Sequence, residues 1–341
     1  MIRSPLPAAG GLATLLGAGL IAGLFADRAT ASTSPRILYQ DDGAKPATAA
    51  QPVARTPFDC TARDTFTLTP ALWDTVLTAD TTGGPALVPG YGCRPWPEQG
   101  PEHIYRLEVT ADVQLRAALS DLGTQDLDLF LLDGCDTDAC LAGANAELVA
   151  VLTPGTWWLV VDGYGTDAPA AGPYALTLET RWVGVPPPVC LPGGAAPVMC
   201  AARLDSTLAD APDLMQAYDC SPSLLTGGEV WCELTVPGLH DLSARATPDS
   251  RAPTLDLALW LFDGCGPAAV CLGFVDARAG GQQETIDWSN TDAGPITVYL
   301  AVDTRRAPDS AVTGSFGLSV DCQSHVAAER RPLGSVKALY R

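Results

Sequence analysis

The chain has 341 residues, of which 39 are acidic and 20 basic, so its formal net charge is −19. Such an acidic surface repels nucleic acid and anionic lipid, and we expect neither as a partner. The chain also has 11 cysteines, only three histidines and no CxxC motif, a composition that argues against zinc and for disulfides. The length allows two domains of ordinary size.

The first 31 residues have the features of a secretory signal peptide. A basic residue, Arg3, precedes an apolar run over residues 11–25, and Ala29-Thr-Ala31 supplies a cleavage site before Ser32. The alternative is an uncleaved anchor, but the run is shorter than the ~20 residues that usually span a bilayer. We therefore expect cleavage and no stable membrane insertion afterwards. Residues 32–55 are low in large apolar side chains and are predicted to form a disordered leader.

The rest of the chain is dominated by two copies of one unit. The block DLDLFLLDGC at 126–135 returns as DLALWLFDGC at 256–265. Three more blocks recur in the same order. YGC at 91–93 returns as YDC at 218–220, WWLVVD at 157–162 as VYLAVD at 298–303, and GPYALTL at 172–178 as GSFGLSV at 314–320. We assign copy one to residues 56–182, a Pro-rich linker to 183–189, copy two to 190–323 and a basic tail to 324–341.

The period within these blocks is two residues. In the segment 103–109, Tyr105, Leu107 and Val109 share one face, whereas Arg106 and Glu108 share the other. This alternation is typical of half-buried antiparallel strands, and clusters of Gly, Pro and Asp separate them. The sequence therefore predicts an all-β protein made of two tandem jelly-roll-like β-sandwiches.

The repeat also indicates how the cysteines pair. We expect five bonds, each within one copy: Cys60–Cys93, Cys135–Cys140, Cys200–Cys220, Cys265–Cys271 and Cys232–Cys322. The last bond follows if the second and final strands of copy two pair. Cys190 then remains free or bonds to another chain, and a competing arrangement joins Cys190 to Cys322.

The Asp-Gly-Cys block, the segment GTWWLVVDG at 155–163 and the closing GPYALTL at 172–178 resemble the bacterial pre-peptidase C-terminal (PPC) domain. Cysteine-rich versions of it occur in secreted proteins of myxobacteria-like organisms. The resemblance covers nearly all of residues 56–323, more strongly in copy one. It implies a secreted, periplasmic or cell-surface bacterial protein and a sandwich module that accompanies extracellular enzymes without catalytic residues of its own.

Some members of that family bind calcium, and Asp126, Asp128 and Asp133 are weak candidates for it here. Asp126 and Asp128 would share a strand face and could chelate together. The alternative is a solvated face of the strand. Family members commonly carry acidic or Asn-Asp residues after the second cysteine of the tight pair, but this chain has CLAGAN at 140–145. We therefore expect no specific metal site and no cofactor.

Catalytic and binding residues are sparse. There is no GxSxG or HExxH motif, and His103 and His240 are isolated, so we predict no catalytic residue. Trp157 and Trp158 are adjacent and must face opposite ways on a strand. One belongs to the core, and the other is exposed or covered by a loop. An exposed tryptophan can stack on a sugar or a protein, and Trp231 and Trp260 raise the same question in copy two.

These observations favour a secreted, non-catalytic accessory or adhesion-type binding protein whose partner is an extracellular protein or polysaccharide. Two alternatives belong to other classes. One is an extracellular hydrolase with an unrecognised active site, and the other is a calcium-stabilised structural protein of the envelope.

Overall fold

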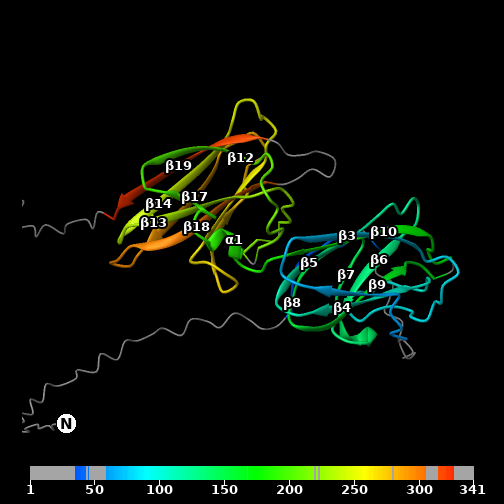
Figure 1. The fold of residues 1–341 in the computed structure, drawn as a ribbon. Helices are drawn as coiled ribbons and strands as arrows, with labels where there is room; N and C mark the ends of the chain where they lie inside the picture. The colour runs from blue at the N-terminus through cyan, green and yellow to red at the C-terminus, as the bar shows by residue number, and fades with distance from the viewer. Residues whose placement is uncertain are drawn as a thin grey trace, which may run out of the picture. The chain divides into compact units, whose positions relative to one another are not determined.

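The computed structural model describes residues 35–43, 45, 59–166, 168–218, 220–221, 223–278, 280–304 and 314–325. The predicted signal peptide, most of the predicted leader and all but two residues of the predicted tail lie outside these ranges. In the part that is described, the regular structure is almost entirely β-strand, which confirms the all-β prediction of tandem sandwiches (Figure 1). No helix among the described residues is long and apolar enough to cross a membrane.

Copy one contains two five-stranded sheets. The first has the order β1 (Arg36–Gln40), β8 (Glu147–Leu152), β5 (Val113–Ser120), β10 (Pro173–Arg181), β3 (Trp73–Asp80). The second has the order β2 (Asp64–Leu68), β4 (His103–Val109), β9 (Gly155–Gly163), β6 (Leu127–Leu132), β7 (Cys140–Ala144). All neighbours pair antiparallel except β2 and β4, which run parallel.

Copy two repeats this arrangement without a counterpart of β1. Its first sheet has the order β12 (Ala202–Thr207), β19 (Ser315–Ser324), β14 (His240–Pro248), β17 (Glu284–Asn290). Its second has the order β11 (Ala196–Val198), β13 (Val230–Val236), β18 (Ile296–Thr304), β15 (Leu257–Phe262), β16 (Cys271–Val275). The parallel pair recurs as β11 with β13. The sequence repeat is therefore a repeat of topology.

Strand β6 is buried along its whole length because both of its faces are covered. Leu127, Leu129 and Leu131 join the core between the two sheets of copy one. Phe130 and Leu132, on the opposite face, pack in a second cluster. Strand β15 of copy two divides its side chains between two clusters in the same way. Each copy therefore needs a further layer outside its second sheet.

A loop supplies that layer. We call residues 85–102 the cover segment of copy one, and it brings Val88, Tyr91 and Trp96 onto the outer face of β6. Residues 212–229 form the cover segment of copy two, where Tyr218 stacks on Trp260 with ring centroids 3.7 Å apart. The loop has no periodic pattern, so the sequence gives no sign of this third layer.

Five disulfides are present and each lies within one copy, as expected, but all five predicted pairings are wrong. The bonds are Cys60–Cys135, Cys93–Cys140, Cys190–Cys265, Cys200–Cys322 and Cys220–Cys271. Cys60–Cys135 and Cys190–Cys265 both span 75 residues, while Cys93–Cys140 and Cys220–Cys271 span 47 and 51. Two bonds are thus common to both copies and Cys200–Cys322 is private to copy two.

Four of the five errors follow from the docking of the cover segments, which join Cys93 to Cys140 and Cys220 to Cys271. Gly92 N donates to Thr137 O (3.0 Å), and this contact carries Cys93 to Cys140 and away from Cys60. The expected Cys232–Cys322 bond fails because β13 and β19 belong to opposite sheets. Cys322 is bonded to Cys200 instead.

Two segments expected to lack regular structure have it. Part of the predicted leader forms β1, because the apolar run Ile37-Leu38-Tyr39 interrupts this stretch, and Ile37 and Tyr39 pair with the edge of β8 on either side of a register shift. The predicted Pro-rich spacer carries the short helix α1 (Pro187–Cys190), since proline is tolerated in the first turn of a helix. Val185 and Gly266 exchange two backbone hydrogen bonds of 3.2 Å, which fasten this linker to copy two.

The unpaired thiol is Cys232, not Cys190 as predicted. Cys232 is fully buried in the core of copy two, and burial raises the pKa of its thiol to about 12. Because the thiolate is the reactive form, we expect no alkylation by iodoacetamide at pH 8 in the native protein and one labelled cysteine after unfolding without reductant. Mass spectrometry of the labelled peptides checks both. Rapid native labelling, or labelling at Cys190, would contradict this structure.

Candidate functional site

A buried acidic pocket lies on the outer face of copy one, beneath its cover segment. Asp128 points to this face because it alternates with Leu127 and Leu129 along β6. Glu98 approaches from the cover segment, where its backbone forms an isolated β-bridge with Tyr164. Both carboxylic side chains are fully buried. Two acids thus share an apolar environment with the ring of Trp96.

An ammonium group from the chain's own leader occupies this pocket. Lys45 Nζ contacts both carboxylate oxygens of Asp128 and lies 2.7 Å from Oδ1 of Asp126. The Lys45 side chain is 6% exposed, whereas Asp126, at the rim, is 46% exposed. Lys45 is one of only two lysines in the chain. The pocket therefore encloses one cation between a deep acid and a rim acid.

Two aromatic rings complete the enclosure. Lys45 Nζ lies 5.0 Å from the ring centroid of Trp96 and 4.6 Å from that of Tyr164. Both distances are within the ~6 Å over which a cation interacts with the face of a ring. Tyr164 N donates to Asp126 O (3.0 Å), which holds the ring beside the start of β6. Paired carboxylates with flanking rings suit an ammonium ion better than a metal ion, which prefers a shell of oxygens.

The electrostatics of the two deep acids differ. Burial, and then the neighbouring charges of Asp128 and Asp162, raise the pKa of Glu98 to about 11, so Glu98 is neutral at physiological pH. A side-chain hydrogen bond with Asp128 also raises the pKa of Glu98, as expected when the neutral acid donates its proton to the neighbouring carboxylate. Burial raises the pKa of Asp128 to about 6, and Lys45 is the largest opposing influence. Asp128 is therefore the main buried anion that neutralises the ammonium group above pH 6.

A second polar network beside the pocket belongs to the scaffold, because both copies have it. Tyr91 donates its hydroxyl proton to Asp162 (2.8 Å), and Tyr218 donates to Asp303 in copy two (3.3 Å). Backbone amides of each cover segment donate to a buried glutamate in the same way: Leu87 to Glu102, Leu214 and Met215 to Glu229. These hydrogen bonds attach the cover segment to the sheet in both copies.

The acid pair, in contrast, is private to copy one. Glu102 and Glu229 are equivalent in the two copies, and the same offset places Leu225 at the position of Glu98. The offset between the two Asp-Gly-Cys blocks places Ala258 at the position of Asp128. Leu225 and Ala258 are buried as completely as the acids they replace. Copy two therefore has an equivalent cover segment, with Leu225 and Ala258 in place of the two acids. We call these two residues the apolar floor of copy two. Copy two thus has the same fold without acids at these two positions.

The structure separates the three calcium candidates. Asp126 and Asp128 lie at the start of β6 and hold Lys45, but Asp133 follows the end of the strand and is exposed. Seven residues of extended chain, ~23 Å, separate Asp126 from Asp133, so they cannot share one ion. Within the described ranges, no group of three or more His, Cys, Asp or Glu side chains is arranged to hold a metal.

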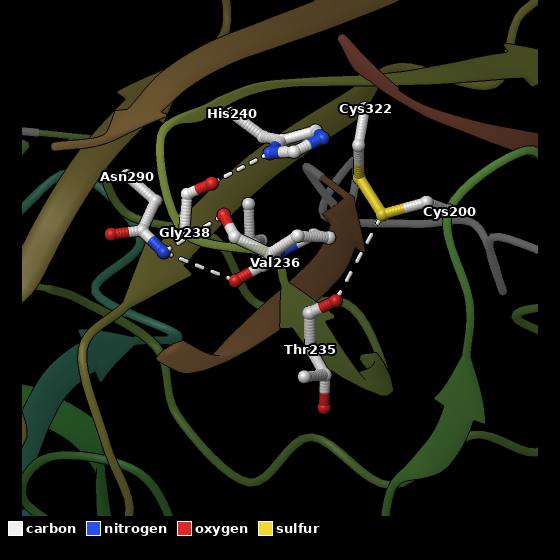
Figure 2. Close-up of a disulfide and its surroundings, with 8 residues drawn as sticks. Cys200, Thr235, Val236, Gly238, His240, Asn290 and Cys322 are labelled. Carbon is white, nitrogen blue, oxygen red and sulfur yellow. Dashed lines mark hydrogen bonds between the residues drawn. A yellow bond between two sulfur atoms is a disulfide. The ribbon is translucent and has the colours of Figure 1, made fainter. Parts of the chain in front are cut away.

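The histidines have structural partners. His103 Nδ1 lies 2.8 Å from the hydroxyl of Tyr174, and burial, followed by the charge of Arg63, lowers the pKa of His103. His240 Nδ1 lies 2.7 Å from Gly238 O, in a turn where Asn290 Nδ2 also donates to Val236 O. Figure 2 shows this turn beside the Cys200–Cys322 disulfide.

The third histidine, His325, contacts a carboxylate. Its Nε2 lies 2.7 Å from Oδ1 of Asp241, and the hydroxyl of Ser289 donates to the same oxygen. No histidine in the described residues is hydrogen-bonded to a serine or cysteine side chain, the contact that activates a nucleophile.

Three of the four tryptophans proposed as binding residues are buried. Trp157 lies in the sandwich core, as expected for one member of the pair, while Trp231 and Trp260 lie beneath the cover segment of copy two. The proposal fails for these three because their rings have no free face for a ligand. Trp158 is half-buried, with Arg106 5.8 Å above its ring.

The sequence singled out Asp126 and Asp128, as calcium candidates, but the other four residues that form the pocket were missed. Glu98, Trp96 and Tyr164 lie in loops without periodicity, and Lys45 comes from a segment predicted to be disordered. One signal was available. Aligning the two copies through Glu102 and Glu229 shows an acid in copy one where copy two has Leu225.

Removing the ammonium group should destabilise the protein in a pH-dependent way. Lys45→Ala leaves Asp128 buried without its partner, a loss of about 3 kcal/mol in the free energy of unfolding at pH 8. The pKa of Asp128 is about 6 in the folded protein, above its ordinary value of 3.8. Protonation of Asp128 therefore stabilises the folded state. This stabilisation is complete below pH 3.8 and is lost as the pH rises through 6. The difference between wild type and variant should therefore shrink below pH 5.

Urea unfolding at pH 8 and pH 4.5 measures this difference, with Lys337→Ala as the matched control that removes the other lysine. A pH-independent effect of Lys45→Ala would contradict the assignment of Asp128 as its partner.

Copying the floor of copy two into copy one should preserve the fold. We expect the triple variant Lys45→Ala/Glu98→Leu/Asp128→Ala to raise the free energy of unfolding by about 1–3 kcal/mol, because apolar groups replace the whole buried ion pair and leave no charge without its partner. Thermal unfolding measures the gain, and the alkylation pattern of Cys232 checks that the fold is intact. A large loss of stability would show that the acids are structural.

Comparisons with known proteins leave the chain without an assigned family. No family model matches it, and no curated protein matches its sequence. Solved structures with some similarity include a periplasmic inhibitor of g-type lysozyme, PliG, from Aeromonas hydrophila (14% identity, 35% of this chain and 99% of that chain, TM-score 0.25). Another is a tandem CBM22 domain of Xyn10C from Paenibacillus barcinonensis (12% identity, 75% of this chain and 100% of that chain, TM-score 0.23). Function has to be argued from the site itself.

Proposed function

We propose that this is a secreted, non-catalytic binding protein whose ligand site is the acidic pocket of copy one, and that the site recognises a primary ammonium group such as the end of a lysine side chain. The single observation that carries the proposal is Lys45, bound between Asp126 and Asp128 in a pocket that copy two replaces with apolar residues. In this view Lys45 marks the chemistry of the ligand.

The surroundings of the pocket support binding without turnover. The deep acids face a cation and two aromatic rings, with no nucleophile aimed at the same point among the described residues. The five disulfides fit an oxidising, extracytoplasmic compartment. We also propose that both copies are PPC-type modules, on the basis of the sequence blocks that they share.

The pocket should bind a lysine analogue once its own lysine is removed. We expect full-length Lys45→Ala protein to bind Nα-acetyl-lysine N-methylamide with a Kd on the order of 1 mM or below. The norleucine analogue, which has the same apolar stem without the ammonium group, should not bind. Isothermal titration at pH 8 compares the two ligands.

The control receptor is Lys45→Ala combined with Glu98→Leu and Asp128→Ala, which reproduces the floor of copy two and should not bind. Equal binding of the two analogues, or of the lysine analogue by both receptors, would refute the proposal.

A further inference from the structure

The leader reaches the pocket along a defined path. Strand β1 pairs antiparallel with the edge strand β8, and Asp41 then continues the ladder by donating to Glu147 O (2.8 Å) and accepting from Asn145 N (2.9 Å). Lys45 enters the pocket five residues after the end of β1. The leader thus makes main-chain hydrogen bonds along an edge and inserts one side chain, two features of peptide recognition by strand addition.

The turn between these contacts is also held by specific residues. Gly43 has φ +49° and donates its N–H to Asp41 (3.1 Å), a conformation that favours glycine. Arg94 forms an ion pair with Asp42 and donates to Gly143 O (2.7 Å). A Cβ at Gly143 would meet Arg94 Cγ at 2.6 Å, so glycine there gives the arginine room to lie across β7. A ligand that follows this path must turn before it presents its lysine.

Copy two shows that a sandwich of this kind does not need the added strand. Its strand β17, which corresponds to β8, ends its sheet with no further described strand beside it. Copy two also has the apolar floor of Leu225 and Ala258 in place of a cation pocket. The added strand and the ammonium pocket therefore occur together in copy one, and the described part of copy two has neither.

We propose, resting on the proposed function, that β8 and the acidic pocket form one groove for an extended, lysine-bearing segment of another protein, and that residues 36–43 together with Lys45 fill this groove as an intramolecular competitor. The partner adds a strand to β8 and places a lysine ammonium between Asp126 and Asp128. Exchange of leaders between two copies of this chain is disfavoured, because it repeats the same contacts and adds the entropic cost of association.

An attached leader competes at an effective concentration of about millimolar, so a free segment should bind the wild-type protein weakly. Weakening the leader should reveal the groove. Lys45→Ala removes the inserted ammonium group, and Tyr39→Pro removes a ladder donor from β1.

The test uses a fluorescent peptide of residues 35–45 (PRILYQDDGAK) and the full-length double variant Lys45→Ala/Tyr39→Pro, with fluorescence anisotropy as the readout. We expect this receptor to bind the peptide at least about tenfold more tightly than wild type does, and more tightly than it binds the lysine amide. Replacing the peptide's lysine by norleucine should abolish the gain, as should adding Glu98→Leu and Asp128→Ala to the receptor. The single variant Lys45→Ala, which keeps β1, should show a smaller gain in the same direction.

The outcomes separate the two proposals. If the receptor binds the lysine amide but binds the peptide no more tightly, the groove is refuted and the ammonium pocket stands. If it binds neither, both proposals fail. If gel filtration of wild type shows a concentration-dependent dimer that Lys45→Ala abolishes, the occupant is a second copy's leader and the inference of a foreign partner is overturned.

Discussion

The site depends on the burial of one strand from both sides. Strand β6 carries apolar residues on each face, and the facing sheet can cover only one of them. The other face must be sealed by a loop, which the Cys93–Cys140 disulfide and the hydrogen bonds of Glu102 hold in place. An acid on the sealed face loses its water. The unusual chemistry of Asp128 and Glu98 therefore follows from a packing requirement of the fold.

This layering explains which features the sequence could predict. The alternation of Tyr105, Leu107 and Val109 describes a strand with one core face, and all three are buried. The block at 126–135 alternates at its start and then runs through Phe130, Leu131 and Leu132, a pattern that is consistent with burial on both faces but does not identify the segment that covers the second face. The covering residues come from a loop rich in Gly and Pro, where no period links sequence to position. The site combines that loop with a lysine distant in sequence, so local patterns could not assemble it.

The same limit applies to the disulfides. Reasoning from the repeat predicted four bonds with equivalents in the two copies and one private to copy two, and the observed bonds follow that pattern with other partners. Choosing partners by nearness in sequence failed, because Cys140 meets a loop that begins much earlier in the chain. Symmetry between the copies was the reliable constraint, and sequence separation was not.

Duplication also provides an internal reference for function. Contacts found in both copies, such as Tyr91 with Asp162, maintain the scaffold, and differences between the copies show what one of them has gained or lost. The buried acids of copy one cost desolvation energy that copy two avoids with Leu225 and Ala258. An ammonium group offsets that cost above pH 6, and a proton on Asp128 offsets it below. A proton and the leader's lysine thus compete for one carboxylate, so acidification should release Lys45, and under the proposed function it should release the lysine of a ligand in the same way.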